Sequence, residues 1–248
     1  MFRGIGTLIN VLAVLAGSGL GVLLGHRLPQ RTRETVTDAL GLVTLLIAGL
    51  AALNVADPVL TGAIGSDAPV LVVLFALVVG GVIGSLLRIE HRLESFGDVL
   101  RRRLAGAGDN ATRHRFIEGF VTSSLVFCVG PLTVLGSLSD GLGNGAQQLI
   151  LKSVLDGFAS IAFAASFGVG VMASALVVLA VQGSLTLLGA LLGSFVPEPH
   201  LIAITATGGV LLAGVGLRLL QVKAVPVGDL LPALLVAPLL VELVVVVH

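Results

Sequence analysis

Lys152 and Asp156 are the residues of this sequence whose types and spacing could do chemistry. They lie four residues apart inside an apolar run, so on a helix they share one face and can pair. A charge at the centre of a membrane helix costs about 2.5–3.5 kcal/mol and usually faces a protein interior or a wet cavity. We expect Asp156 to be a cation or proton site and Lys152 its charge partner. The alternative is a structural ion pair, with the lysine ammonium extended toward the membrane surface.

Other polar side chains lie in similar apolar runs. Ser153 and Ser160 share the run of the charged pair, and Asn10 and Gln182 lie in two other runs. We include all four as candidate substrate- or ion-binding residues. Taken singly, Asn10 and Gln182 are more typical of helix–helix hydrogen bonds than of ligands.

A proline interrupts a further apolar run at Gly130–Pro131. Proline has no amide hydrogen and disfavours a straight helix, which frees the carbonyl of Phe127. At membrane depth such groups persist only where protein or water satisfies them. We therefore predict a broken helix that offers backbone ligands at a depth similar to that of the carboxylate, with a plain kink as the alternative. Ser123 and Ser124 precede the break and complete the candidate site.

Motifs for enzymatic chemistry are scarce. All five histidines lie in loops, at the edges of apolar runs or at the C-terminus, and no nucleophile–base pair is evident. Cys128 is the only cysteine, with no neighbouring cation or histidine, and is expected to be a buried, inert thiol. We expect no catalytic residue, no metal site, no cofactor and no enzymatic activity.

The elements that hold these residues must be membrane helices. The chain is 56% hydrophobic and only 11% charged, with a mean hydropathy of +1.09, whereas soluble domains are about 25% charged. Apolar runs of about 20 residues, enough to cross a bilayer core, recur without the alternation of membrane strands. We predict an all-α membrane protein with eight spans: Ile5–Leu24, Val36–Val55, Pro69–Leu87, Phe116–Leu138, Leu149–Phe167, Val171–Leu192, Leu201–Leu217 and Leu230–Val247.

The basic residues predict the orientation of these spans. Every Lys and Arg except Arg3 and Lys152 falls in an odd-numbered loop, and the even-numbered loops carry acidic residues such as Asp57, Asp67 and Asp140. Because basic loops stay in the cytoplasm, both termini are expected outside.

The third loop, residues 88–115, is the only sizeable segment outside the predicted spans. Apolar residues recur at helical spacing from Ile89 to Leu104 among Arg and Glu, a pattern typical of an amphipathic helix at the membrane surface. A solvated loop is the alternative. The orientation rule already explains the arginines, so nucleic acid is not expected as a partner.

An internal repeat relates the two ends of the chain. The segment Leu20–Gly25 recurs at Leu188–Gly193, and the same shift of 168 residues places Pro29 on Pro197. The second copy lies five spans after the first, and because this shift is an odd number of crossings the copies cross the membrane in opposite directions. We therefore predict a single membrane domain with an inverted repeat, repeat A over about 5–88 and repeat B over about 171–248, around central spans at 116–168. Chance similarity between Leu- and Gly-rich helices is the alternative.

These motifs together resemble the bacterial YqgA-type membrane family over essentially the whole chain. The resemblance is carried by Gly6–Asn10, Gly25–Pro29, Phe127–Pro131 and Lys152–Gly157. It implies a prokaryotic inner-membrane protein and supplies no substrate.

The repeat and the polar residues favour a small-solute or ion transporter of the inner membrane, secondary and coupled to a cation or proton, because inverted repeats are typical of such transporters. A non-transporting scaffold or sensor acting through the Arg-rich loop is the alternative. The expected partners are membrane lipids and a small solute or ion, and a homo-oligomer is compatible with the sequence.

Overall fold

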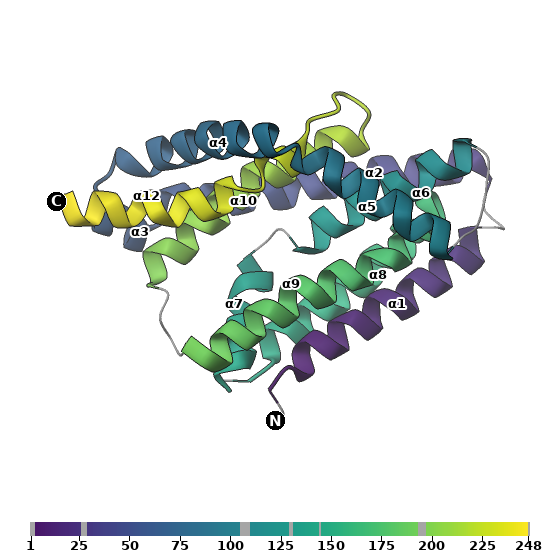
Figure 1. Cartoon of the computed structure of the whole chain (residues 1–248), viewed down its shortest axis with the longest axis horizontal. Coiled ribbons are helices and arrows are strands. Elements are labelled where there is room, and N and C mark those ends of the chain that lie inside the picture. Colours follow the sequence, from purple (N-terminus) through teal and green to yellow (C-terminus); the bar gives the residue numbers. More distant parts are fainter. Residues whose placement is uncertain are drawn as a thin grey trace. The chain divides into compact units, whose positions relative to one another are not determined.

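The computed structural model describes residues 3–25, 29–104, 110–128, 131–143, 145–192 and 197–247, and within these ranges it contains helices and no strands (Figure 1). The elements in chain order are α1 (Ile5–Gly25), α2 (Gln30–Ala52), η1 (Leu53–Ala56), α3 (Pro58–Ile64), α4 (Ala68–Leu87), α5 (Ile89–Leu104), α6 (Asn110–Cys128), α7 (Pro131–Leu142), α8 (Gln147–Phe167), α9 (Gly170–Leu192), α10 (Glu198–Leu219), α11 (Val227–Leu230) and α12 (Ala233–Val247).

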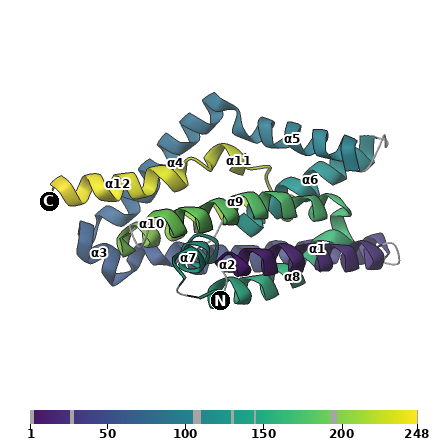
Figure 2. The same ribbon diagram turned by 60° about the horizontal axis from the view of Figure 1, so that its bottom comes forward.

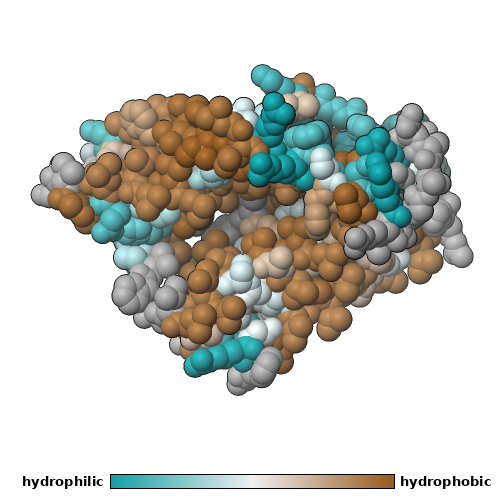
Figure 3. Space-filling view, in the orientation of Figure 1, coloured by the Kyte–Doolittle hydropathy of each residue, from teal (hydrophilic) through white to brown (hydrophobic). Residues whose placement is uncertain are grey.

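The predicted spans correspond to helices of membrane-crossing length. Seven helices in the described ranges are long and apolar enough to cross, and α6 with α7 forms an eighth, bent candidate. Many exposed side chains on these helices are Leu, Val and Ile. Figure 3 shows them as a hydrophobic surface over α4, whereas hydrophilic side chains gather over α5. A surface of this kind suits lipid, and the all-α membrane fold is confirmed.

The helices form two compact units. Unit 1 comprises residues 1–41, 93–128 and 132–194, and unit 2 comprises residues 42–92, 129–131 and 195–248. Helices α2 and α5 each begin in one unit and end in the other. Each unit therefore contains segments from both halves of the chain, in contrast to the consecutive arrangement of the predicted repeats.

Glycines on α1 allow it to pack closely against α8 in unit 1. A Cβ atom on Gly21 would collide with the carbonyl oxygen of Ile161, and Gly17 and Gly25 meet carbonyls of α8 in the same way. The spacing of four residues places all three glycines on one face of α1. Small residues at this spacing let membrane helices pack closely. The two helices lie side by side in both views (Figures 1 and 2).

Glycines also allow close helix packing in unit 2. Cβ atoms on Gly80 and Gly84 of α4 would meet the backbone of Ala233 and Asp229, respectively. The residue numbers rise along α4 as they fall along α11 and α12, so the chain segments run in opposite directions. Gly80 and Gly84 therefore let α4 pack closely against these segments.

Contacts within unit 1 show the relative directions of its helices. Gly6 lies against Leu149, and Gly25 against Ala165, so α1 and α8 run parallel. The first turn of α1 also lies near the end of α9, where the Thr7 and Thr186 hydroxyls are 3.1 Å apart, so α1 and α9 run in opposite directions. Both directions agree with the eight-span order, in which spans one and five run in the same direction and spans one and six in opposite directions.

The bent pair α6–α7 follows α9 from one end to the other. Phe116, in α6, lies against Gly170 at the start of α9, and Leu138, in α7, lies against Gly189 near its end. A re-entrant loop would return to the end of α9 where it began. The contacts near both ends of α9 favour a broken span over a re-entrant loop.

Helix boundaries recur at the shift found in the sequence. Gln30 begins α2 and Glu198 begins α10, 168 residues later, and each directly follows one of the aligned prolines. The short helices α3 and α11 correspond as well, since Pro58 begins α3 and Pro226 is the N-cap of α11. Gly193, at the end of the repeated segment, lies outside the described residues. The inverted symmetry that would relate the two copies remains a prediction.

The Arg-rich third loop contains the expected helix, α5. Its first turn is held in unit 2, where Glu90 accepts hydrogen bonds from Arg218 and from the amide of Gly228. Its second half is held in unit 1, where Asp98 forms ion pairs with Arg102 at 3.0 Å and with Arg113 at 2.9 Å. The helical alternative is therefore correct, and its position at the membrane surface remains a prediction.

Candidate functional site

The centre of the site is the ion pair on α8. The Lys152 ammonium lies 3.0 Å from Asp156 Oδ1 and 2.7 Å from Oδ2, so it bridges both carboxylate oxygens. The exposed fractions of the two side chains are 8% and 9%. The i, i+4 spacing produces this geometry locally, as predicted. A buried charge of either sign is costly alone, and the pairing offsets that cost.

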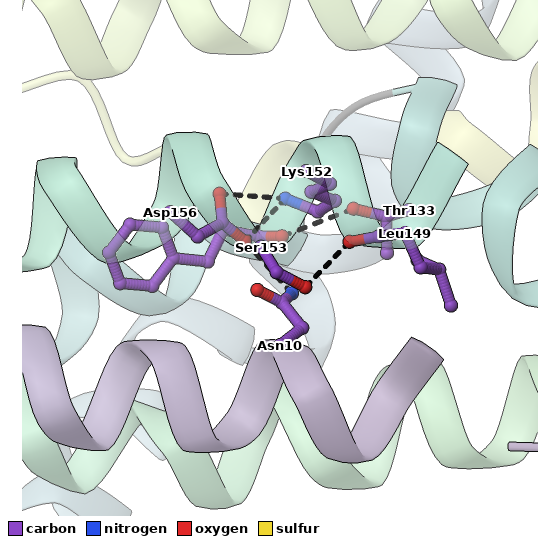
Figure 4. A network of polar contacts seen from close by, with 7 residues as sticks. Asn10, Thr133, Leu149, Lys152, Ser153 and Asp156 are labelled. Atoms are coloured by element: carbon purple, nitrogen blue, oxygen red, sulfur yellow. Dashed lines mark hydrogen bonds and ion pairs between the residues drawn. The ribbon is translucent and has the colours of Figure 1, made fainter. Parts of the chain in front are cut away.

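Helix α1 contributes Asn10 to the pair. Its side-chain amide donates from Nδ2 to Asp156 Oδ2 over 2.9 Å, and Figure 4 shows the side chain directed from α1 toward α8. The other amide atom, Oδ1, is buried and has no hydrogen-bond partner. The close approach of α1 to α8 at the glycines places this short side chain within reach of the carboxylate.

The helix break lies beside the pair. Helix α6 ends at Cys128, α7 begins at Pro131, and their axes differ by 75°. The Phe127 carbonyl, which the proline was expected to free, accepts a hydrogen bond from the Thr133 hydroxyl at 3.1 Å. Cys128 is close enough to Lys152 and Asp156 to interact with their charges. The end of α6 therefore lies near the pair, whereas Gly130, within the break, lies outside the described residues. The similar depth of the break and the carboxylate stays a prediction.

Two of the remaining candidates lie on the buried face of α8 that carries Asp156. The hydroxyls of Ser153 and Ser160 donate to carbonyls of their own helix, those of Leu149 and Gly157. Such bonds satisfy a serine hydroxyl in a membrane helix without a ligand. The structure therefore assigns these two serines to local helix hydrogen bonding.

The other three candidates divide into a bonded and an unbonded group. Ser123 donates to the carbonyl of Gly119 at 2.6 Å, again within its own helix. Ser124 and Gln182 are buried without a hydrogen-bond partner, and Gln182, fully inaccessible, has both amide atoms unpaired. Buried polar groups normally find partners, so Gln182 is the stronger of the two as a ligand group.

Two residues of the polar interior escaped the sequence reasoning. Thr133 closes the helix break, and a hydroxyl residue two positions after an intramembrane proline is the signal that could have identified it. Asp140, expected in an outer loop, is instead 2% exposed in α7 and accepts a hydrogen bond at 3.0 Å from the amide of Gly6. The Asp140 carboxylate accepts from an amide in the first turn of α1 that has no partner within the helix, and its negative charge interacts favourably with the partial positive charge at the start of that helix. Nothing in the local sequence pairs these two residues.

Buried polar side chains are concentrated in one unit. Among the described residues, the buried polar or charged side chains all belong to unit 1 except Thr44, Thr205 and Thr207. Within the described ranges, no group of three or more His, Cys, Asp or Glu side chains could hold a metal ion. Unit 1 thus offers a carboxylate, an ammonium, amides and hydroxyls, which suit small ions or polar solutes.

Comparisons with known proteins agree with a membrane protein of this kind. The family model described as "Protein of unknown function (DUF554)" matches residues 5–242. The chain is 31% identical over 233 residues to "Uncharacterized protein YqgA" of Escherichia coli strain K12, covering 94% of each chain. It is 28% identical over 236 residues to "Uncharacterized membrane protein YdfK" of Bacillus subtilis strain 168, covering 95% of each. No solved structure gives a significant match. The family match over nearly the whole chain shows that this protein belongs to the DUF554 family.

Proposed function

We propose that this protein is a small-solute or ion transporter of the bacterial inner membrane, secondary and coupled to a cation or proton. The observation that carries the proposal is the buried Lys152–Asp156 pair, held by Asn10 beside an interrupted helix. Ionisable residues inside membrane segments and broken helices at membrane depth are both typical of ion and substrate pathways. In this proposal Asp156 binds the cation or proton, and Lys152 is its charge partner.

The distribution of polar side chains supports the same function. Unit 1 has the polar interior, whereas unit 2 is packed almost entirely from apolar residues and glycine in the described ranges. The recurrence of helix boundaries at one shift supports an inverted repeat, in which two halves of opposite orientation give alternating access. Two of the proposed pairs of equivalent helices, α1 with α9 and α4 with α12, each fall within a single unit, whereas α2, the proposed equivalent of α10, extends over both units.

Binding of a cation by Asp156 is the direct test of the proposal. The thermal midpoint of the purified protein should rise with the concentration of Na⁺, K⁺ or H⁺, because a ligand that binds only the folded state stabilises it. At 100 times the dissociation constant the stabilisation is about 2.7 kcal/mol. The dependence should vanish in Asp156→Asn and persist in Asp67→Asn, which alters an exposed acid. A wild-type midpoint that does not change with the concentration of any of these cations would favour the scaffold or sensor function.

The proposed orientation places both termini outside and the odd-numbered loops in the cytoplasm. Ser66 and Lys223 are exposed residues in the second and seventh loops, so single cysteines at these positions, in a Cys128→Ser background, report opposite sides. An impermeant thiol reagent added to intact cells should label Ser66→Cys, and Lys223→Cys only after permeabilisation. Labelling of both positions in intact cells would contradict the eight-span orientation.

A further inference from the structure

We propose that the Lys152 ammonium is a tethered competitor that occupies a monovalent-cation site formed by Asp156 and Asn10. The inference rests on the proposed function and deepens it by naming the class of ion and the group that controls its access. A cation would bind when the ammonium leaves, and the ammonium would return when the cation leaves.

The Lys152 ammonium lies where a cation bound by Asp156 would lie. Lys152 Nζ contacts both carboxylate oxygens, at 3.0 and 2.7 Å. A monovalent metal ion shared by two carboxylate oxygens would occupy the same position and carry the same charge. Exchange of one for the other leaves the net charge of this buried region unchanged, which avoids the cost of an isolated buried charge.

The side-chain amide of Asn10 can provide a further oxygen ligand for the cation. Its Nδ2 donates to Asp156 Oδ2, and its buried Oδ1 has no partner. A half-turn of the terminal amide exchanges the two atoms and directs a carbonyl-type oxygen at the position beside the carboxylate. Hard cations prefer such oxygen ligands. An amide donor serves the carboxylate while the ammonium is present, and an amide acceptor serves the metal ion once the ammonium has left.

The place of Lys152 on its helix allows the ammonium to leave. Lys152 is five residues from Gln147, the first residue of α8, or roughly 7.5 Å along the axis at 1.5 Å per residue. A lysine stem can extend toward the membrane surface from such a position. Asp156 lies one turn deeper and its side chain is short, so the carboxylate stays behind as the ion-binding group.

Removal of the competitor should tighten cation binding. When a competing group occupies a site for most of the time, the apparent dissociation constant exceeds the intrinsic one by the inverse of the free fraction. Lys152→Met removes the ammonium and keeps a stem of similar length, whereas Lys152→Arg retains a tethered cation. We expect the apparent dissociation constant for Na⁺ or K⁺, from thermal shifts at constant ionic strength, to fall at least tenfold in Lys152→Met and to remain weak in Lys152→Arg.

A second measurement uses the wild-type protein, so it does not depend on how a variant folds. The chain has two lysines, Lys152 and Lys223, and the second is exposed. Acylation by an amine reagent, quantified for each lysine by mass spectrometry, should increase at Lys152 as the bound cation replaces its ammonium. Acylation of Lys223 should not change, and the rise should be absent in Asp156→Asn.

The outcomes separate the inference from the function on which it rests. Cation stabilisation that requires Asp156 but is no tighter in Lys152→Met, with Lys152 acylation insensitive to the cation, overturns the competitor and leaves the transporter proposal standing. Absence of cation stabilisation in wild type and in Lys152→Met overturns both.

Discussion

Asp156→Asn is expected to abolish cation flux in proteoliposomes, and the double variant Lys152→Met with Asp156→Leu is expected to be folded and inactive. Each single change leaves one charge buried without its partner. Breaking a buried pair in this way costs about 3–5 kcal/mol, whereas replacing both partners by apolar residues of similar volume is often neutral or stabilising. Asp156→Asn and Lys152→Ala should therefore lower the unfolding midpoint in detergent, and the double variant should largely recover it.

Flux and stability together distinguish a functional pair from a structural one. Flux would be measured as the change of an ion-sensitive dye inside the liposomes after an imposed gradient of Na⁺, K⁺ or H⁺. Asp67→Asn, in an exposed position outside the polar interior, serves as the control and should transport at the wild-type rate. Full flux in the double variant would remove the pair from the mechanism and assign it a structural role only.

Gly21→Ala should destabilise the protein far more than Gly183→Ala. Both glycines lie in membrane helices of unit 1, but a Cβ on Gly21 would collide with the Ile161 carbonyl, whereas a Cβ on Gly183 has nothing within 4 Å. Overpacking of this kind costs about 1–3 kcal/mol, and alanine at an open helix position gains up to about 1 kcal/mol in propensity. The two variants should shift the midpoint in opposite directions.

The glycine comparison also tests how the site is assembled. Asn10 reaches Asp156 because α1 lies so close to α8, so a displaced α1 weakens that hydrogen bond as well as the packing. Gly21→Ala should therefore weaken cation stabilisation, and Gly183→Ala should preserve it. Equal midpoints and equal cation responses in the two variants would show that the close approach of α1 to α8 contributes nothing.

The local features of this protein were predictable from its sequence. Apolar length and helical spacing determine that the spans are helices, because a backbone in lipid must satisfy its own polar groups. The four-residue spacing determines that Lys152 and Asp156 meet, and the chemistry of Pro131 determines that the Phe127 carbonyl is freed. Each of these results depends on residues within one or two helical turns, where the geometry is known in advance.

Only the tertiary structure decided which distant residues meet the pair. Asn10 bonds to Asp156 across 146 positions, and Gly6 to Asp140 across 134, whereas Gln182, which is similar in sequence context, bonds to neither. Helix periodicity shows which face of a helix is buried. It does not show which helix covers that face, or at what offset along the axis. That offset depends on the packing of small residues such as Gly17, Gly21 and Gly25 against backbone carbonyls, a match of two surfaces that exists only once both helices are in place.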